Sequence, residues 1–332
     1  MNTLAVPPLA SDGDLTVALA GQPNVGKATV FNLLTGLSQR TGRWPAGGLE
    51  QKTGTYHYDH STLHIVDLPS VHSLTANSLE ERIARDYIIV AHPDVVVVIA
   101  DAAALETSLY LLAELLCLPV PVVLGLNMLD AAGREGLHLE PHVLEAALAL
   151  PVVPMVASRN QGMHELVEAV RRVACQMAAY APHRPEISPD HRLVLAEIQR
   201  LIAGRVPPPY PEDWVALKLL EGDAEITSMI QSRLPDQWES VHALLRQHED
   251  AILAVASGRY AWIGRMVRAA VIHPKAGQVT LTDRLDRATT HPVGGLLVLV
   301  AVVGLALTLG RPPEGRNPTW VADALPFVSS DS

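Results

Sequence analysis

Short apolar runs alternate with longer helix-period segments between Leu15 and about Tyr180. Five runs rich in β-branched residues predict strands, namely "LTVALA", "TLHIVDLP", "DVVVVIAD", "PVVLGLN" and "PVVPMVA". Wholly apolar runs of this kind are typical of a parallel sheet that helices cover on both faces. The segments "TSLYLLAELLCL" and "MHELVEAVRRVACQMAAY" are long enough to form such helices. After a flexible N-terminus at 1–14, we therefore expect a doubly wound α/β domain over 15–182, with ligands at the carboxyl ends of its strands.

The pattern becomes helical after two proline-rich breaks, "APHRPEISP" and "RVPPPYPEDW". Val194, Ile198 and Leu201 fall at the spacing of one helix face, and Trp214 begins a similar segment. This segment shows no alternation of apolar and polar residues of the kind that strands have. Residues 183–272 are therefore predicted to form a small all-α domain.

The last feature of the pattern is "VGGLLVLVAVVGLALTLG" at 293–310, which has 18 residues and no charge. A bilayer core requires about 20 apolar residues, with about 17 as the lower limit. Arg284 and Arg287 precede the run in the manner of a cytoplasmic flank. The pattern favours one transmembrane helix over a buried globular helix, with a juxtamembrane linker at 273–292 and a tail at 311–332.

The charge balance excludes one class of partner. The chain has a net charge of −10 and no basic stripe, so we do not expect it to bind nucleic acid. Cys117 and Cys175 are far apart and form no CxxC pair, which indicates a reducing compartment. We expect both cysteines to be small core residues. The N-terminus, "MNTLAVPPLASDGD", lacks the basic and apolar parts of a secretory signal.

The segment "GQPNVGKATVFNLLTG" follows the first predicted strand and matches the spacing GxxxxGK. Glycines at these positions let backbone N–H groups surround a phosphate, the following helix adds its positive end, and the lysine reaches the β- and γ-phosphate oxygens. The sequence therefore predicts a phosphate-binding loop. Its residues are Gly21, Asn24, Val25, Gly26, Lys27, Ala28 and Thr29.

Two positions differ from what such a site requires. The residue after the lysine is normally Ser or Thr, whose hydroxyl binds Mg²⁺, but here it is Ala28. Thr29 cannot replace it, because one step along a helix turns a side chain by about 100°. In "IVDLPS", Asp67 ends a strand at the position that holds Mg²⁺, usually through water. Ser70 replaces the glycine of the DxxG switch, which reduces backbone freedom there.

Base selection is predicted for "NMLD", which follows the fourth strand run. The spacing of Asn127 and Asp130 matches NxxD, and a carboxylate at Asp130 can accept both the N1–H and 2-amino protons of guanine. Adenine lacks this donor pair and would leave the carboxylate unpaired. The segment "MVASRNQG" adds Ala157 and Ser158 at the end of the last strand, where a backbone amide can cover the O6 atom of guanine.

With these pieces in order, the chain resembles the cytoplasmic N-terminal part of the bacterial ferrous-iron transporter B family, FeoB. The resemblance rests on "GQPNVGKATVFNLLTG", "QRTGRWPAGGLEQKTG", "VDLPSVHSLTANSLEERIARDYI", "NMLD" and "TLTDRLDRATTHPVGG". It implies a P-loop GTPase domain that binds GTP or GDP, a helical domain that tunes nucleotide release, and a membrane domain of many helices that moves Fe²⁺. It also implies a protein of the bacterial inner membrane, with residues 1–292 in the cytoplasm.

The resemblance assigns further positions. Asn24 corresponds to the family's asparagine associated with K⁺ beside the phosphates, and Gly48 corresponds to the switch I threonine that binds Mg²⁺. Ala28, Gly48 and Ser70 depart from the family pattern, whereas the base-selecting pair is kept. We therefore expect Mg²⁺ to be weakly bound or dispensable. Hydrolysis should suffer far more than nucleotide binding, because phosphoryl transfer depends on positioning and charge neutralisation.

Three functional hypotheses follow. The first is a membrane-anchored, guanine-nucleotide-binding regulatory domain of ferrous-iron uptake with weak or absent hydrolysis. The second is a slow GTPase that K⁺ at Asn24 and water-held Mg²⁺ at Asp67 support. The third is a pseudo-GTPase that docks onto a full-length ferrous-iron transporter or forms homo-oligomers. Because the family continues through many membrane helices, the chain is either a natural short relative or a piece of a longer protein.

Other conspicuous residues have simpler interpretations. Trp44 is either a switch-loop contact or a packing anchor, and "SLEERIARD" from Ser78 is a capped helix start with a solvated face. Four histidines close together are expected to be solvated loop or strand residues rather than iron ligands. These are His57, His60, His64 and His72.

Overall fold

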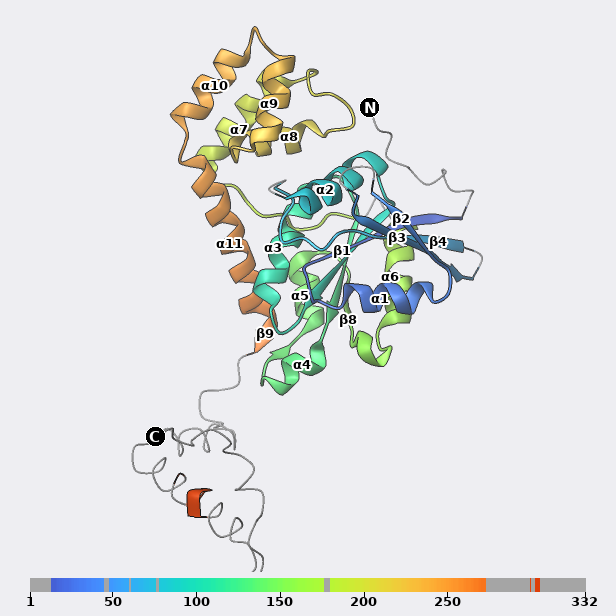
Figure 1. Cartoon of the computed structure of the whole chain (residues 1–332). Helices are drawn as coiled ribbons and strands as arrows, with labels where there is room; N and C mark the ends of the chain where they lie inside the picture. The colour runs from blue at the N-terminus through green and yellow to red at the C-terminus, as the bar shows by residue number, and fades with distance from the viewer. Residues whose placement is uncertain are drawn as a thin grey trace, which may run out of the picture. The chain divides into compact units, whose positions relative to one another are not determined.

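The structure is a computed structural model of the chain (Figure 1). The residues that it describes are 13–44, 48–59, 61–75, 78–175, 180–272, 299 and 302–304. Residues 13–272 belong to one compact unit.

The predicted transmembrane run at 293–310 lies almost wholly outside the described residues, as do the linker and tail on either side of it and His60. Within the part that is described, none of the helices combines the length and the apolar character that crossing a bilayer requires.

A seven-stranded sheet forms the centre of the first part of the chain, with the strand order β2-β3-β4-β1-β5-β6-β8 (Figure 1). Five of its strands are parallel and coincide with the five apolar runs, which confirms the predicted doubly wound sheet. They are β1 (Leu15–Gly21), β4 (Ser61–Asp67), β5 (Val95–Asp101), β6 (Val122–Asn127) and β8 (Val152–Pro154). Their carboxyl ends meet at one edge, where the predicted nucleotide residues lie.

An antiparallel hairpin extends the sheet beyond β4, which the apolar pattern did not predict. Its strands are β2 (Gln39–Arg43) and β3 (Glu50–Tyr58), and β3 pairs with β4. All five residues of β2 are exposed, so no apolar alternation marks the strand in the sequence. Gly54 is required in β3, because a Cβ there would lie 2.4 Å from the side chain of Thr35.

Helices cover both faces of the sheet, as predicted. Val17 and Leu19 of β1 face one apolar cluster with α1 and α6, whereas Ala18 and Ala20 face the other cluster with α2, α3 and α5. This alternation follows from the period of two along a strand. The helices of this part are α1 (Lys27–Thr35), α2 (Leu79–Ala91), α3 (Leu105–Leu115), α4 (Leu129–Arg134), α5 (Pro141–Leu148) and α6 (Met163–Cys175).

Ser78 caps α2, because its side chain accepts a hydrogen bond of 3.1 Å from the Glu81 amide. The cap confirms the predicted helix start, but the prediction of a solvated face fails at Arg85, whose side chain is fully buried. Cys175 also differs from expectation. It is exposed at the end of α6, whereas Cys117 is half-buried.

The second part is all-α, as predicted, and returns to the first part at its end. Its helices are α7 (Pro189–Ile202), α8 (Glu212–Leu220), α9 (Ala224–Arg233), α10 (Trp238–Gln247) and α11 (Ala251–Ala270). The long helix α11 packs against α3 and α5. After it, β9 (Val271–Ile272) pairs with β7 (His138–Leu139), so that a short ribbon joins the two parts.

Candidate nucleotide site

The predicted phosphate loop connects β1 to α1 and turns through left-handed backbone conformations. Asn24 has a φ of 68° and Gly26 a φ of 89°. A Cβ on Gly26 would lie only 2.3 Å from Nδ2 of Asn127, so the conformation and the close approach both require glycine. Lys27 then begins α1. The loop thus holds its backbone amides next to the start of a helix, which is the arrangement that favours anions.

Asn127 ties two loops together at the end of β6. Its side-chain amide donates a hydrogen bond of 2.9 Å to the Val25 carbonyl, and its Oδ1 accepts one of 2.9 Å from the Ala157 amide. The residue is buried, so both hydrogen bonds are shielded from water. The Ala157 amide, one of the predicted base-covering positions, is thus already hydrogen-bonded to Asn127.

Lys27 and Asp67 meet at the carboxyl edge of the sheet. The Lys27 ammonium donates to the carboxylate of Asp67 and, at 2.5 Å, to the carbonyl of Leu68. The side chains of Lys27 and Asp67 are 7% and 13% exposed, so their charges neutralise each other in a poorly solvated place. An entering phosphate would compete with Asp67 for the lysine.

Three further predicted positions, two of the phosphate loop and one of the switch, are exposed to solvent. Ala28 and Thr29 are exposed, and Ala28 has no side-chain oxygen. Ser70 is exposed as well, beyond the end of β4.

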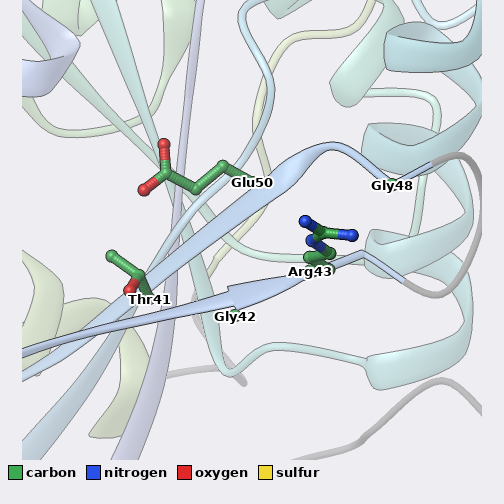
Figure 2. Close-up of a pocket in the computed structure, with 5 residues that line it drawn as sticks. All are labelled: Thr41, Gly42, Arg43, Gly48 and Glu50. Atoms are coloured by element: carbon green, nitrogen blue, oxygen red, sulfur yellow. The ribbon is translucent and has the colours of Figure 1, made fainter.

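Gly48 lies in the connection between β2 and β3, with a φ of 70°. It lines a shallow cavity of about 460 Å³ on the hairpin, together with Thr41, Gly42, Arg43 and Glu50. In Figure 2 the side chains of Arg43 and Glu50 arise from these two neighbouring strands. A glycine there supplies no hydroxyl.

The donor set therefore does not fit a tightly held Mg²⁺. The resemblance assigns Mg²⁺ ligands to positions 28, 48 and 67. Among these, Asp67 alone has a side-chain oxygen, and Lys27 already pairs with it. Mg²⁺ prefers several oxygen ligands in a near-octahedral arrangement.

Asp130 lies in the first turn of α4, just after Met128, whose φ is 62°. Its Oδ2 lies 3.6 Å from Arg134 and 3.7 Å from Arg159, and both arginine side chains are mostly exposed. The carboxylate thus lies near the loop that contains Ser158. Arg159 was not predicted, although a basic residue directly after Ser158 is a visible signal.

A buried charge cluster, which sequence reasoning missed, lies where the segment after Asp67 meets the helical part. Glu114 of α3 accepts hydrogen bonds from the Leu74 amide at 2.5 Å and from Arg259 of α11 at 3.2 Å. Lys218 of α8 lies 3.5 Å from Glu114 and 2.8 Å from Glu221, and Arg259 also donates to Glu221. We call Glu114, Lys218, Glu221 and Arg259 the junction cluster.

The two carboxylates of the junction cluster favour the charged forms of its two cations. Burial alone would lower the pKa of Lys218, but the carboxylates of Glu114 and Glu221 outweigh it and raise that pKa above its usual range. The pKa of Arg259 is raised for the same reason. The backbone after the predicted DxxG switch is thus hydrogen-bonded to Glu114, which in turn pairs with Lys218 and Arg259 from two helices of the second part.

Arg85 makes a second connection between the two parts. Its guanidinium donates hydrogen bonds to Asp86 at 2.9 Å and to Glu225 of α9 at 3.0 Å, and it lies 6.0 Å from the ring centre of Trp214. Trp44 is buried against Tyr87 of the same helix α2, with ring centres 5.4 Å apart, so it is a packing anchor.

Comparison with known proteins agrees with this geometry. The family model for the ferrous iron transport protein B, FeoB_N, matches residues 15–170, and that for the FeoB cytosolic helical domain matches residues 193–272. The Fe(2+) transporter FeoB of Escherichia coli (strain K12) is 30% identical over 302 residues, which are 89% of this chain and 38% of that protein. The protein of the same name from Methanocaldococcus jannaschii is 34% identical over 290 residues, which are 86% of this chain and 43% of that protein.

Solved structures give the same result. A GDP-bound S. thermophilus NFeoB variant is 29% identical, with a TM-score of 0.71 over 78% of this chain and 100% of that chain. The cytosolic domain of the T. maritima FeoB iron transporter, in a GDP form, is 29% identical, with a TM-score of 0.69 over 80% of this chain and 100% of that chain. The chain spans about two fifths of the length of the curated relatives that it matches. It belongs to the FeoB family and contains the family's N-terminal G domain and cytosolic helical domain.

Proposed function

We propose that this protein is the guanine-nucleotide-binding regulatory part of a ferrous-iron uptake system, and that it hydrolyses GTP weakly or not at all. The observation that carries the proposal is the double hydrogen bond of Asn127 to Val25 and Ala157. One buried side chain thereby fixes the phosphate loop relative to the loop that faces the base. Such preorganisation reduces the ordering cost of binding a ligand that spans both loops.

The phosphates are proposed to bind the amides of residues 21–29 and the ammonium of Lys27, and the base to bind Asp130. When the γ- or β-phosphate approaches Lys27, it takes the place of Asp67 as the partner of the ammonium. The guanine N1–H and 2-amino groups then donate to the Asp130 carboxylate. The relatives crystallised with GDP support this assignment.

Weak hydrolysis is proposed from the three departures at Ala28, Gly48 and Ser70. Without the two hydroxyls, the site lacks ligands that would fix Mg²⁺ against the phosphates, and positioning of charge is the main source of rate in phosphoryl transfer. A slow, K⁺-dependent turnover through Asn24 is the alternative, and a hydrolysis assay with and without K⁺ separates the two.

The helical part is proposed to tune nucleotide release through the junction cluster and Arg85. Leu74 and Arg85, through which these connections are made, both follow Asp67 in the chain. When Asp67 loses Lys27 as its partner, the segment that follows it is proposed to shift and to alter these contacts with the helical part. The name that the curated relatives share, Fe(2+) transporter, supports iron movement as the process that is regulated. We further propose that 293–310 anchors the chain in the bacterial inner membrane, with residues 1–292 on the cytoplasmic side.

The proposal is tested by calorimetric titration of the full 332-residue chain in detergent with GDP, xanthosine diphosphate and ADP, with and without Mg²⁺. We expect GDP to bind, ADP not to bind, and Mg²⁺ to change the GDP affinity little. In Asp130→Asn, an amide N–H faces the C2 position of the base, so the preference should move from GDP towards the xanthine nucleotide, which has a carbonyl there.

Glu135→Gln is the matched control, because Glu135 is an exposed carboxylate that directly follows α4. It should leave the base preference unchanged. Equal affinity for GDP and ADP, or an unchanged preference in Asp130→Asn, would refute guanine selection by Asp130. If no nucleotide binds, the pseudo-GTPase scaffold becomes the better description, and light scattering then tests the homo-oligomer that it implies.

A further inference from the structure

Three side chains with metal-ligating atoms meet in the helical part. His191 lies in the first turn of α7, and His248 and Asp250 lie in the connection between α10 and α11. One donor atom from each lies within 4.8 Å of the others. In the part of the chain that the structure describes, this is the one group of three or more such residues that converges in this way.

Hydrogen bonding fixes the orientation of His191. Its Nδ1 lies 2.7 Å from the hydroxyl of Ser188, and its Nε2 points at Asp250, with 3.3 Å between Nε2 and Oδ2. The side chain is 11% exposed, whereas that of Asp250 is 73% exposed. A histidine ligand whose second nitrogen is held by another polar group is typical of protein metal sites. The ring is therefore aimed at an acidic group that a solvated cation can reach.

The spacing suits a small divalent cation. In a tetrahedral site, metal–ligand bonds of about 2.0–2.2 Å place neighbouring ligand atoms roughly 3.3–3.6 Å apart. The pair formed by His191 and Asp250 already has this separation. His248 approaches His191 edge-to-face, with ring centres 6.3 Å apart, and would move inward by roughly 1.5 Å to complete the set. A helix connection permits such a movement more readily than a helix interior does.

From this geometry we propose that His191, His248 and Asp250 bind a divalent first-row transition cation. Two imidazole nitrogens and one carboxylate favour Zn²⁺, Fe²⁺ or Co²⁺ over Mg²⁺, which prefers oxygen ligands alone. The cation lies between Nε2 of His191 and Oδ2 of Asp250 in place of their direct contact, and any proton on Nε2 leaves to water. It thereby ties the start of α7 to the start of α11, the helix that packs on α3 and α5.

The experiment is a Co²⁺ titration of the full chain in detergent, without nucleotide and after removal of metals with EDTA. Co²⁺ bound to nitrogen and oxygen ligands has a visible d–d absorption, which Zn²⁺ should abolish by displacement. We expect His191→Asn, His248→Asn and Asp250→Asn each to weaken binding by at least about 100-fold, and Ser188→Ala by about tenfold. His164→Gln is the control, because His164 lies 3.4 Å from the carboxylate of Glu168 and belongs to no group of three converging ligands among the described residues.

Asp250→Asn decides the test even if the buried His191 is needed for folding, because Asp250 is mostly exposed. An unchanged melting temperature with lost Co²⁺ absorption supports the site. Two results would overturn it. Either the parent chain shows no d–d absorption at millimolar Co²⁺, which leaves only a hydrogen-bonded helix junction, or Asp250→Asn and His248→Asn bind Co²⁺ as tightly as the parent.

Discussion

The nucleotide loops and the junction cluster both bury charged side chains, but they differ in how many partners each charge has. At the loops, Lys27 has one carboxylate partner, Asp67, beside the exposed residues that follow it. At the junction, two carboxylates and two cations from α3, α8 and α11 satisfy one another. A pair at the edge of a loop can exchange its partner for a phosphate. A closed set of four cannot open without leaving a charge unpaired, so we interpret the first as a binding device and the second as a structural link.

The largest expected effect comes from breaking the junction cluster. Glu114→Ala removes the one carboxylate that contacts Lys218, Arg259 and the Leu74 amide. Removing one partner from a buried charge network costs about 3–5 kcal/mol of unfolding free energy, because the remaining charges stay buried. Denaturation of the full chain by urea, followed by circular dichroism, measures the loss.

Glu197→Ala is the control for this change, since Glu197 pairs with Arg200 on the exposed surface of α7. We expect no measurable change in its unfolding midpoint. A loss of less than about 1 kcal/mol in Glu114→Ala would mean that the junction charges are solvated, and the contrast with the nucleotide loops would fail.

The second effect concerns the backbone of the loops. Gly26→Ala places a Cβ at a φ of 89°, 2.3 Å from Nδ2 of Asn127, so the hydrogen bond between Asn127 and Val25 must break or the loop must move. The left-handed conformation alone costs about 1–2 kcal/mol, and GDP affinity should fall by at least about tenfold. Calorimetric titration with GDP measures the affinity, and thermal unfolding measures the stability.

Gly133→Ala provides the opposite case. Gly133 lies in α4, with open space at its Cβ position, so alanine there should stabilise the chain by about 0.4–1 kcal/mol and leave GDP binding unchanged. If Gly26→Ala binds GDP as the parent does, the loop conformation described above is not the one that binds the nucleotide.

The sequence predicted the parallel sheet well, and the reason is physical. β5 and β6 are apolar up to their last residues, Asp101 and Asn127, and burial on both faces of the sheet requires such a pattern. The hairpin strand β2 was missed, because its polar residues pair only through their backbones and remain exposed. The motifs likewise predicted that Lys27, Asp67 and Asn127 lie at one edge of the sheet, because loops at the carboxyl ends of parallel strands converge there.

What the sequence could not predict are partners that are distant along the chain. Arg85 appears in the sequence as part of a solvated helix face, yet Glu225, 140 residues away, makes its burial possible. Glu114 and Arg259 are separated by 145 residues, and neither belongs to a motif. His191 and Asp250 meet only because α7 and the α10–α11 connection are neighbours. Periodicity shows which side of a helix is buried, but it does not show which residue of opposite charge pairs with a buried charge.

A smaller effect is expected when a missing Mg²⁺ ligand is restored in the phosphate loop. Ala28→Ser restores a hydroxyl directly after Lys27, so GDP affinity should become dependent on Mg²⁺, by about tenfold, as expected for one polar contact to a charged ligand. Ala28→Cys is the control, because it has nearly the same size but a soft sulfur that Mg²⁺ does not prefer. GDP titrations with and without Mg²⁺ measure both variants. A Mg²⁺ response of equal size in the parent chain would contradict the proposed loss of the ion's ligands.

The smallest effect is expected outside both regions, at Tyr87 of α2, whose hydroxyl is buried without a hydrogen-bond partner among the described residues. Tyr87→Phe removes that unsatisfied group and keeps the contact with Trp44, so the chain should be unchanged or more stable by up to about 1 kcal/mol at pH 7. Burial raises the pKa of Tyr87 to about 12. The unfolded chain therefore loses this proton first, and the parent's stability falls as the pH rises from about 10 towards 12. Tyr87→Phe lacks this contribution, so its advantage should grow over the same range. Urea denaturation of both chains at pH 7 and at pH 11 measures the difference, and an advantage that shrinks with rising pH would show that the hydroxyl reaches water or a partner.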